Sequence, residues 1–138
     1  MQFAQICDRV ETDAETTGPI NLSALAGIWV NSNPDTNGIA RLVMSESNGN
    51  LSLQVYAIGP DGLIDWGTAD INVFTSSPSS RIGAGFTCLY DFGFAETRLQ
   101  GMITKGLLVL AQFHSFKDES RRVGYFVRKY FALAHGRY

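Results

Sequence analysis

Short stretches of alternating apolar and polar residues, separated by clusters of turn-forming residues, run through most of the chain. The stretch from Leu51 to Ile58 shows the pattern most clearly, because Leu51, Leu53, Val55 and Ala57 alternate with other residue types. A period of two places successive side chains on opposite faces of a β-strand. The pattern therefore predicts strands rather than helices.

The predicted strands share this alternation and are bounded by Gly, Pro, Asn, Asp or Ser. They are Ile28–Val30, Ile39–Glu46, Leu51–Ile58, Thr68–Thr75, Gly85–Phe92, Phe94–Thr104, Leu107–Phe116 and Tyr125–Ala134. Residues 63–67 are expected to form a short link before the fourth of these strands. Asn48-Gly49 is typical of a tight hairpin, because both residue types tolerate positive φ.

About eight strands joined by short turns indicate an antiparallel up-and-down meander. Closing such a meander into a barrel removes its two exposed edges. A barrel of about eight strands is either filled by side chains or holds one small ligand. We therefore expect an all-β fold, a single antiparallel up-and-down β-barrel domain over residues 21–138. Residues 1–20 are expected to form a short N-terminal arm, helical or irregular.

Composition and charge narrow the classes of function. The 138-residue chain is 45 % hydrophobic, which suffices for one core, and its net charge of −2 argues against a general nucleic-acid binder. It lacks an apolar run of about 18 residues, the length of a membrane-spanning helix. Its first residues do not have the basic start and long apolar stretch of a secretory signal. We expect a cytoplasmic protein with no nucleic-acid or membrane partner.

The segment Leu25-Ala26-Gly27-Ile28-Trp29 places a short turn and a Gly-x-Trp motif at the start of the first predicted strand. This arrangement resembles the calycin barrels, namely the lipocalins, fatty-acid-binding proteins and avidins. In those barrels the Trp closes one end of the lumen. The resemblance implies a small ligand-binding barrel over roughly residues 22–134, with Trp29 as the plug of one end.

Aromatic and polar side chains set among apolar ones mark candidate ligand contacts. Phe86, Cys88, Tyr90 and Phe92 are predicted to share one strand face. On the predicted strand Leu107–Phe116, the polar Gln112 and His114 share a face with Leu108 and Leu110. The candidate ligand-binding residues are Trp29, Tyr90, Phe92, Arg98, Gln112 and Tyr125.

A carboxylate or imidazole facing an apolar lumen can move a proton. The candidate catalytic residues are Glu96, His114 and Asp91. The alternation leaves two orientations open, since Glu96 and Arg98 also fit a solvent-facing position and His114 also fits a surface or core position. The chain lacks the nucleotide-binding and hydrolase motifs, and His114 is its one histidine away from the C-terminal tail. We therefore expect no cofactor and no metal site.

Three functions are compatible with this reading. The first is a binding protein for one largely apolar small molecule held in the lumen. The second is a cofactor-free isomerase, cyclase or lyase acting on a mostly apolar metabolite in the same cavity. The third is an assembly module with a filled barrel, in which aromatic residues on both faces of Tyr125–Ala134 pair two copies into a homodimer. Titratable groups that converge in a cavity would favour the second over the first.

Overall fold

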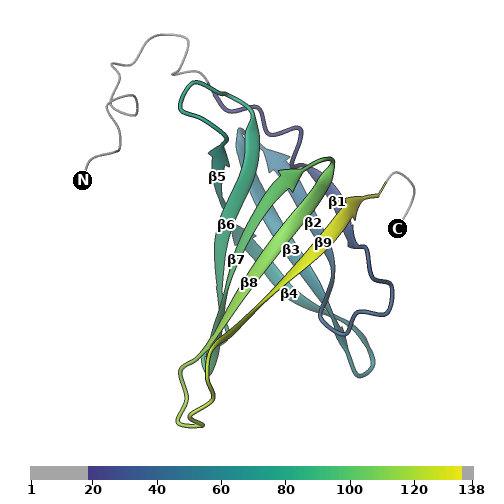
Figure 1. The fold of residues 1–138 in the computed structure, drawn as a ribbon, viewed down its shortest axis with the longest axis vertical. Helices are drawn as coiled ribbons and strands as arrows, with labels where there is room; N and C mark the ends of the chain where they lie inside the picture. The colour runs from purple at the N-terminus through teal and green to yellow at the C-terminus, as the bar shows by residue number, and fades with distance from the viewer. Residues whose placement is uncertain (1–18, 135–138) are drawn as a thin grey trace, which may run out of the picture.

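The computed structural model describes residues 19–134, which form one strongly curled antiparallel sheet with no helix among them (Figure 1). Most of the predicted arm over residues 1–20 lies outside the described residues. The spatial order of the strands is β4-β3-β2-β1-β9-β8-β7-β6-β5. The strands are β1 (Gly27–Asn31), β2 (Ile39–Ser47), β3 (Asn50–Gly59), β4 (Gly62–Asp70), β5 (Asn72–Thr75), β6 (Gly83–Asp91), β7 (Ala95–Thr104), β8 (Leu107–Phe116) and β9 (Tyr125–Leu133).

The all-β antiparallel meander is confirmed, whereas the prediction of a closed barrel is wrong. The edge strands β4 and β5 follow each other in the chain, separated by Ile71, and no ladder joins one edge to the other. At Ile71 a long extended segment leaves the ladder of β3 and joins that of β6. Because β5 pairs only as far as Thr87, the second half of β6 has no ladder partner on this side. The sheet is a half-barrel, and β4 contacts β6 along a seam.

Strand β4 begins earlier than predicted. Residues 63–67, expected to be a link, pair with β3, and the register shifts so that Trp66 and Gly67 together oppose Val55. Such a β-bulge bends a strand and re-aims its side chains. Gly67 has a φ of +92°, which glycine adopts without steric cost, and its N–H donates to the Asp65 carboxylate at 2.8 Å. The bulge breaks the period of two, so alternation alone did not reveal this part of the strand.

Side chains rather than a ladder close the seam. Tyr90 on β6 is 7 % exposed, and its hydroxyl hydrogen is shared between the carbonyl oxygens of Gly67, at 2.8 Å, and Leu53, at 3.3 Å. The rings of Trp66 and Phe92 pack on Tyr90 with centroid distances of 5.4 and 6.1 Å. Burial raises the pKa of the Tyr90 phenol, which keeps its hydroxyl a donor. One residue of β6 thus holds both β3 and β4.

The end of the half-barrel next to the N-terminal side of β1 is filled by side chains. Leu25, from the segment before β1, is fully buried, and the Trp29 Nε1–H donates to its carbonyl oxygen at 2.9 Å. A Cβ added at Gly101 would run into the ring of Phe86, so glycine there lets this buried ring pack against β7. The remaining interior is occupied by buried aliphatic and aromatic side chains, among them Leu42, Leu53, Val55, Leu99, Leu108, Leu110 and Phe131. Trp29, to which the resemblance assigns the plug position, is 2 % exposed.

Removing the Tyr90 hydroxyl should loosen the seam. We expect Tyr90→Phe to lower the free energy of unfolding by about 1–2 kcal/mol, because the donor to the Gly67 and Leu53 carbonyls is lost. Urea titration followed by circular dichroism measures this change. Tyr130→Phe is the matched control, since that hydroxyl is exposed and makes no hydrogen bond within residues 19–134. Equal stability of the two variants would contradict a bridging role for Tyr90.

Candidate functional site

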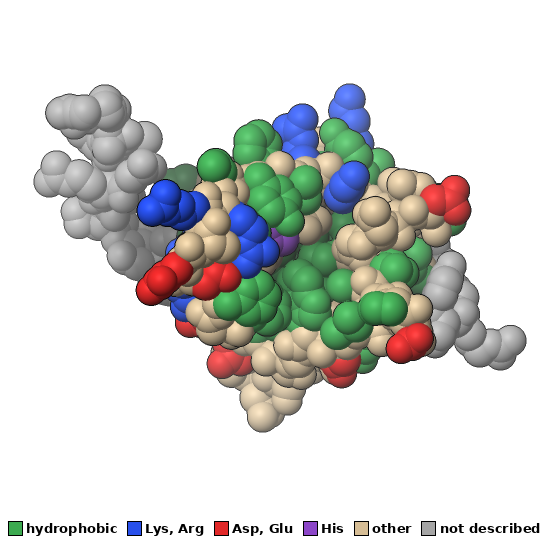
Figure 2. All heavy atoms as spheres, turned by 90° about the horizontal axis from the view of Figure 1, so that it is seen from below, with side chains coloured by type: hydrophobic (Ala, Val, Ile, Leu, Met, Phe, Trp, Pro, Cys, Tyr) green, Lys and Arg blue, Asp and Glu red, His purple; other side chains and the backbone are tan. Residues whose placement is uncertain are grey.

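The opposite end of the half-barrel is hollow. A cavity of about 470 Å³, here called the open-end pocket, lies between β3, β4, β8 and β9, with the loop between β1 and β2 at its lip. Figure 2 looks into this end, where hydrophobic side chains surround a hollow. The apolar walls include Ile39, Ala57, Ile64, Trp66 and Val127.

A buried asparagine fixes the lip of the open-end pocket. Asn31, at the end of β1, is 7 % exposed. Its Nδ2 donates to the Ile39 carbonyl oxygen at 2.9 Å, and its Oδ1 accepts from the Asn33 N–H at 2.8 Å. These bonds tie both ends of the loop whose residues 36–38 line the pocket. The lip is therefore anchored to the sheet through both the nitrogen and the oxygen of this side-chain amide.

Gln112 supplies the most unusual polar group of the pocket. It lies on the inner face of β8, opposite Leu99 on β7 and Val127 on β9, and it is 4 % exposed. Its Nε2 is buried and has no hydrogen-bond partner. Such a group costs about 1–3 kcal/mol relative to a paired one, and most buried polar groups are paired. The Gln112 amide is therefore a donor that a bound molecule can satisfy.

His114 lies two residues further along the same face. Its Nδ1 is 2.9 Å from the Thr97 Oγ1, and its ring stacks on Tyr125 with a centroid distance of 4.7 Å. Register explains this row, because Thr97, His114 and Tyr125 face one another across β7, β8 and β9. Burial lowers the pKa of His114 below its ordinary value of 6.5, so the imidazole is neutral at pH 7.

Lys129 is a lining residue that sequence reasoning did not single out. It lies on β9 opposite the fully buried Leu110, and its exposed side chain lines the edge of the pocket. Its ammonium makes no hydrogen bond or ion pair with any residue between 19 and 134. A signal for it existed in the sequence, since it shares the period-two face of Tyr125, Val127 and Phe131.

The two predicted catalytic carboxylates lie outside the open-end pocket. Asp91 and Glu96 face each other across β6 and β7, and the Lys117 Nζ is 2.7 Å from the Asp91 carboxylate and 3.7 Å from the Glu96 carboxylate. The hydrogen bond from Lys117 holds the pKa of the Asp91 carboxyl below its usual range. Arg98 is exposed between Leu89 and Phe113, also away from the pocket. Of the three catalytic candidates, His114 alone lines the cavity.

The remaining predicted ligand contacts fall into three groups. Gln112 and Tyr125 line the open-end pocket, whereas Trp29 lies in the filled end. Tyr90 and Phe92 pack on Trp66, which lines the pocket, so they support its wall from behind. These contacts place the seam and the pocket wall in one aromatic cluster.

Cys88, on the inner face of β6, is 5 % exposed, and burial raises the pKa of its thiol to about 12. The thiol is therefore protonated at neutral pH, and a protonated thiol is a weak nucleophile. Cys88 acts as a small core residue.

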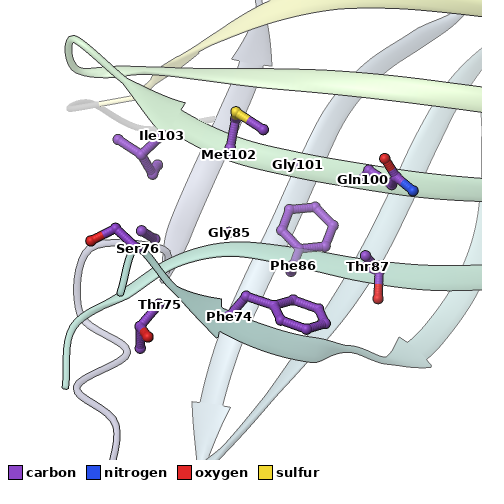
Figure 3. Close-up of a pocket in the computed structure, with 11 residues that line it drawn as sticks. Phe74, Thr75, Ser76, Gly85, Phe86, Thr87, Gln100, Gly101, Met102 and Ile103 are labelled. Atoms are coloured by element: carbon purple, nitrogen blue, oxygen red, sulfur yellow. The ribbon is translucent and has the colours of Figure 1, made fainter. Parts of the chain in front are cut away.

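A second hollow of about 440 Å³ lies on the outside of β5, β6 and β7 (Figure 3). Phe74 and Met102, which are 54 % and 57 % exposed, stand on either side of Gly85, whose missing side chain forms the notch. No titratable side chain lines this groove. It offers chiefly apolar contact, so the open-end pocket is the better candidate site.

Among the described residues, no three His, Cys, Asp or Glu side chains come together in a way that could hold a metal ion. Residues 19–134 also contain no helix long and apolar enough to cross a membrane. Comparisons of the chain with protein-family models, curated proteins and solved structures gave no match. Its curled, up-and-down antiparallel sheet is consistent with a calycin-like fold.

The partly buried His114 should make stability depend on pH. Below 6.5 the unfolded chain binds a proton that the folded chain resists, so the free energy of unfolding should fall as pH falls from this value to the lower folded-state pKa. The His114→Gln variant should lack this fall in the free energy of unfolding. Urea titrations of both proteins between about pH 7.5 and pH 5 measure the difference. Parallel pH profiles for the two proteins would show that His114 is not shifted.

Proposed function

We propose that this protein binds one small, largely apolar molecule in the open-end pocket. The observation that carries the proposal is the Gln112 amide, which is buried without a partner in a cavity with mostly apolar walls. Small-molecule sites are typically cavities of about 300–1,000 Å³ with a few placed polar groups. The volume of about 470 Å³ falls within this range.

The filled end of the half-barrel supports the same function. Leu25 and Trp29 are buried at that end, so we expect a ligand to enter and leave at the lip near residues 36–38. A molecule seated there removes apolar wall area from water, which contributes about 25 cal/mol for each Å² covered. The Gln112 donor then adds orientation to this non-directional attraction.

A cofactor-free isomerase, cyclase or lyase is the second candidate. The observation that favours it is His114, a neutral imidazole in the pocket that can exchange a proton with a substrate. The predicted partners Asp91 and Glu96 are ion-paired with Lys117 outside the pocket lining. The candidate predicts that His114→Gln abolishes turnover while leaving ligand binding in place. Ligand binding does not require a second titratable group beside His114, so binding remains the first proposal.

Pairing of two copies is a separate prediction about the outer face. Phe113 and Phe126 stack at 5.8 Å on the outside of β8 and β9, and Phe126 and Tyr130 are 67 % and 45 % exposed. Apolar surface of this kind often marks an interface. Light scattering coupled to size exclusion should then show a dimer that Phe126→Ser dissociates. A strict monomer at high concentration would contradict the pairing.

A neutral apolar dye tests the binding function directly. N-phenyl-1-naphthylamine should give a saturable rise in fluorescence as it leaves water for the open-end pocket. Val127→Phe, which fills the cavity from β9, should weaken this binding by about tenfold or more through steric exclusion. Val109→Phe is the matched control, because Val109 lies on the outer face opposite Met102 and Tyr130. Absence of saturable binding, or equal loss in both variants, would contradict the proposal.

A further inference from the structure

We infer that the occupant of the open-end pocket is a compact, ring-bearing carboxylate, an inference that rests on the function proposed above. The open-end pocket combines one unpaired positive charge, neutral hydrogen-bond donors and aromatic walls in a short cavity. Each of these features selects a different part of the ligand.

The charge comes from Lys129. None of the Asp and Glu residues described in the structure lines the pocket, and the Lys129 ammonium has no ionic partner within residues 19–134. A pocket edge with a cation and no acid attracts an anion, and salt screens that attraction because the Lys129 side chain is exposed. The ligand group that contacts the Lys129 ammonium is therefore negatively charged.

The donors come from Gln112 and His114. Gln112 pairs with Val127 and Lys129 pairs with Leu110, so Gln112 and Lys129 are diagonal neighbours on one face of β8 and β9. An oxygen anion at this corner can accept from the Gln112 Nε2, which lacks a partner. A carboxylate has two oxygens and several lone pairs, so it serves both groups at once.

The hydrogen bond with Thr97 determines which imidazole nitrogen of His114 carries the proton. Thr97 is 3 % exposed, and the His114 Nδ1 is the one hydrogen-bond partner of its hydroxyl among the described residues. The hydroxyl hydrogen is left unpaired unless it is donated to Nδ1, and burying an unpaired donor is costly. That arrangement leaves the imidazole proton on Nε2, on the opposite side of the ring. His114 is then a further donor rather than an acceptor, which again suits an anionic oxygen.

The size of the ligand follows from the packing behind the pocket. Leu110, Leu99 and Phe131 are fully buried beyond Gln112, so the cavity does not continue along the half-barrel. A volume of about 470 Å³ therefore suits a compact body and not a long extended chain. Trp66 on one side and the stacked His114–Tyr125 pair on the other supply flat aromatic walls. Aromatic walls favour a planar ring, because rings stack or meet edge to face.

Calorimetric titration of the full-length protein with three probes tests this inference. The probes are 2-naphthoate, the neutral alcohol 2-naphthalenemethanol and the chain acid dodecanoate. We expect 2-naphthoate to bind about tenfold or more tightly than the alcohol, since a hydrogen bond to a charged group exceeds one to a neutral group. It should also bind more tightly than dodecanoate. The affinity for 2-naphthoate should fall as salt is added.

Two variants locate the carboxylate. Lys129→Met and Gln112→Leu should each weaken 2-naphthoate binding by about tenfold and leave 2-naphthalenemethanol binding unchanged. Arg128→Met is the matched control, because it removes the same charge from the exposed, outer side of the same strand. It should leave the affinity for 2-naphthoate unchanged. Circular dichroism of each variant checks that the fold is retained.

The outcomes separate this inference from the proposed function. If N-phenyl-1-naphthylamine binds but 2-naphthoate binds no more tightly than the alcohol, the carboxylate is overturned while small-molecule binding stands. If neither naphthalene probe nor the dye binds, both proposals fail. Tighter binding of dodecanoate than of 2-naphthoate would overturn the compact ring. An unchanged affinity of Gln112→Leu for 2-naphthoate would overturn the hydrogen bond from the Gln112 amide to the carboxylate.

Discussion

The hydrogen bonds from the Tyr90 hydroxyl to the carbonyls of Gly67 and Leu53 hold the seam of the half-barrel, and the open-end pocket depends on that seam. The bulge at Trp66 and Gly67 gives Tyr90 its acceptor and also turns Trp66 toward the cavity. One local irregularity therefore sets both the closure of the sheet and one wall of the site. Irregular strands are common beside binding sites for this reason, since regular pleating cannot re-aim a single side chain.

The interior divides along its length, and the inner face of β8 shows the division residue by residue. Leu108 and Leu110 are fully buried in the filled end, Gln112 is buried without a partner, and His114 lines the pocket. Close packing at one end stabilises the fold and offsets the cost of the unpaired amide at the other. Local violations of good packing are expected at functional sites, where the missing partner is supplied by a ligand.

Much of this architecture could be predicted from alternation, since seven of the eight predicted strands have a counterpart and Phe86, Cys88 and Tyr90 are buried on one face. The predicted strand Thr68–Thr75 is instead divided at Ile71 between β4 and β5. Residues 63–67 were missed because a bulge disrupts the period of two. A closed barrel was wrongly expected because an unbroken strand would pair with one neighbour along its whole length. The segment around Ile71 instead pairs with β3 before this residue and with β6 after it.

The candidate site was partly visible in the sequence. Gln112, His114 and Tyr125 come together because they occupy one face in adjacent registers. Asp91 and Glu96 do not join them, since a one-residue change of phase sends a side chain to the opposite face. Lys129 is itself exposed, so the alternation that places it on one face with Tyr125 and Val127 does not mark it as a pocket residue. Its place in the pocket follows only from its pairing with the buried Leu110.

The charges outside the pocket bear on the field inside it. The chain has a net charge of −2, which by itself disfavours an anionic ligand. Lys117, however, lies 2.7 Å from the Asp91 carboxylate and 3.7 Å from that of Glu96, which reduces the negative field of this outer cluster. Exposed charges farther away are screened over about 8 Å at physiological salt. The Lys129 ammonium therefore outweighs the net charge of the chain within the pocket, because it is the one formal charge among the lining residues.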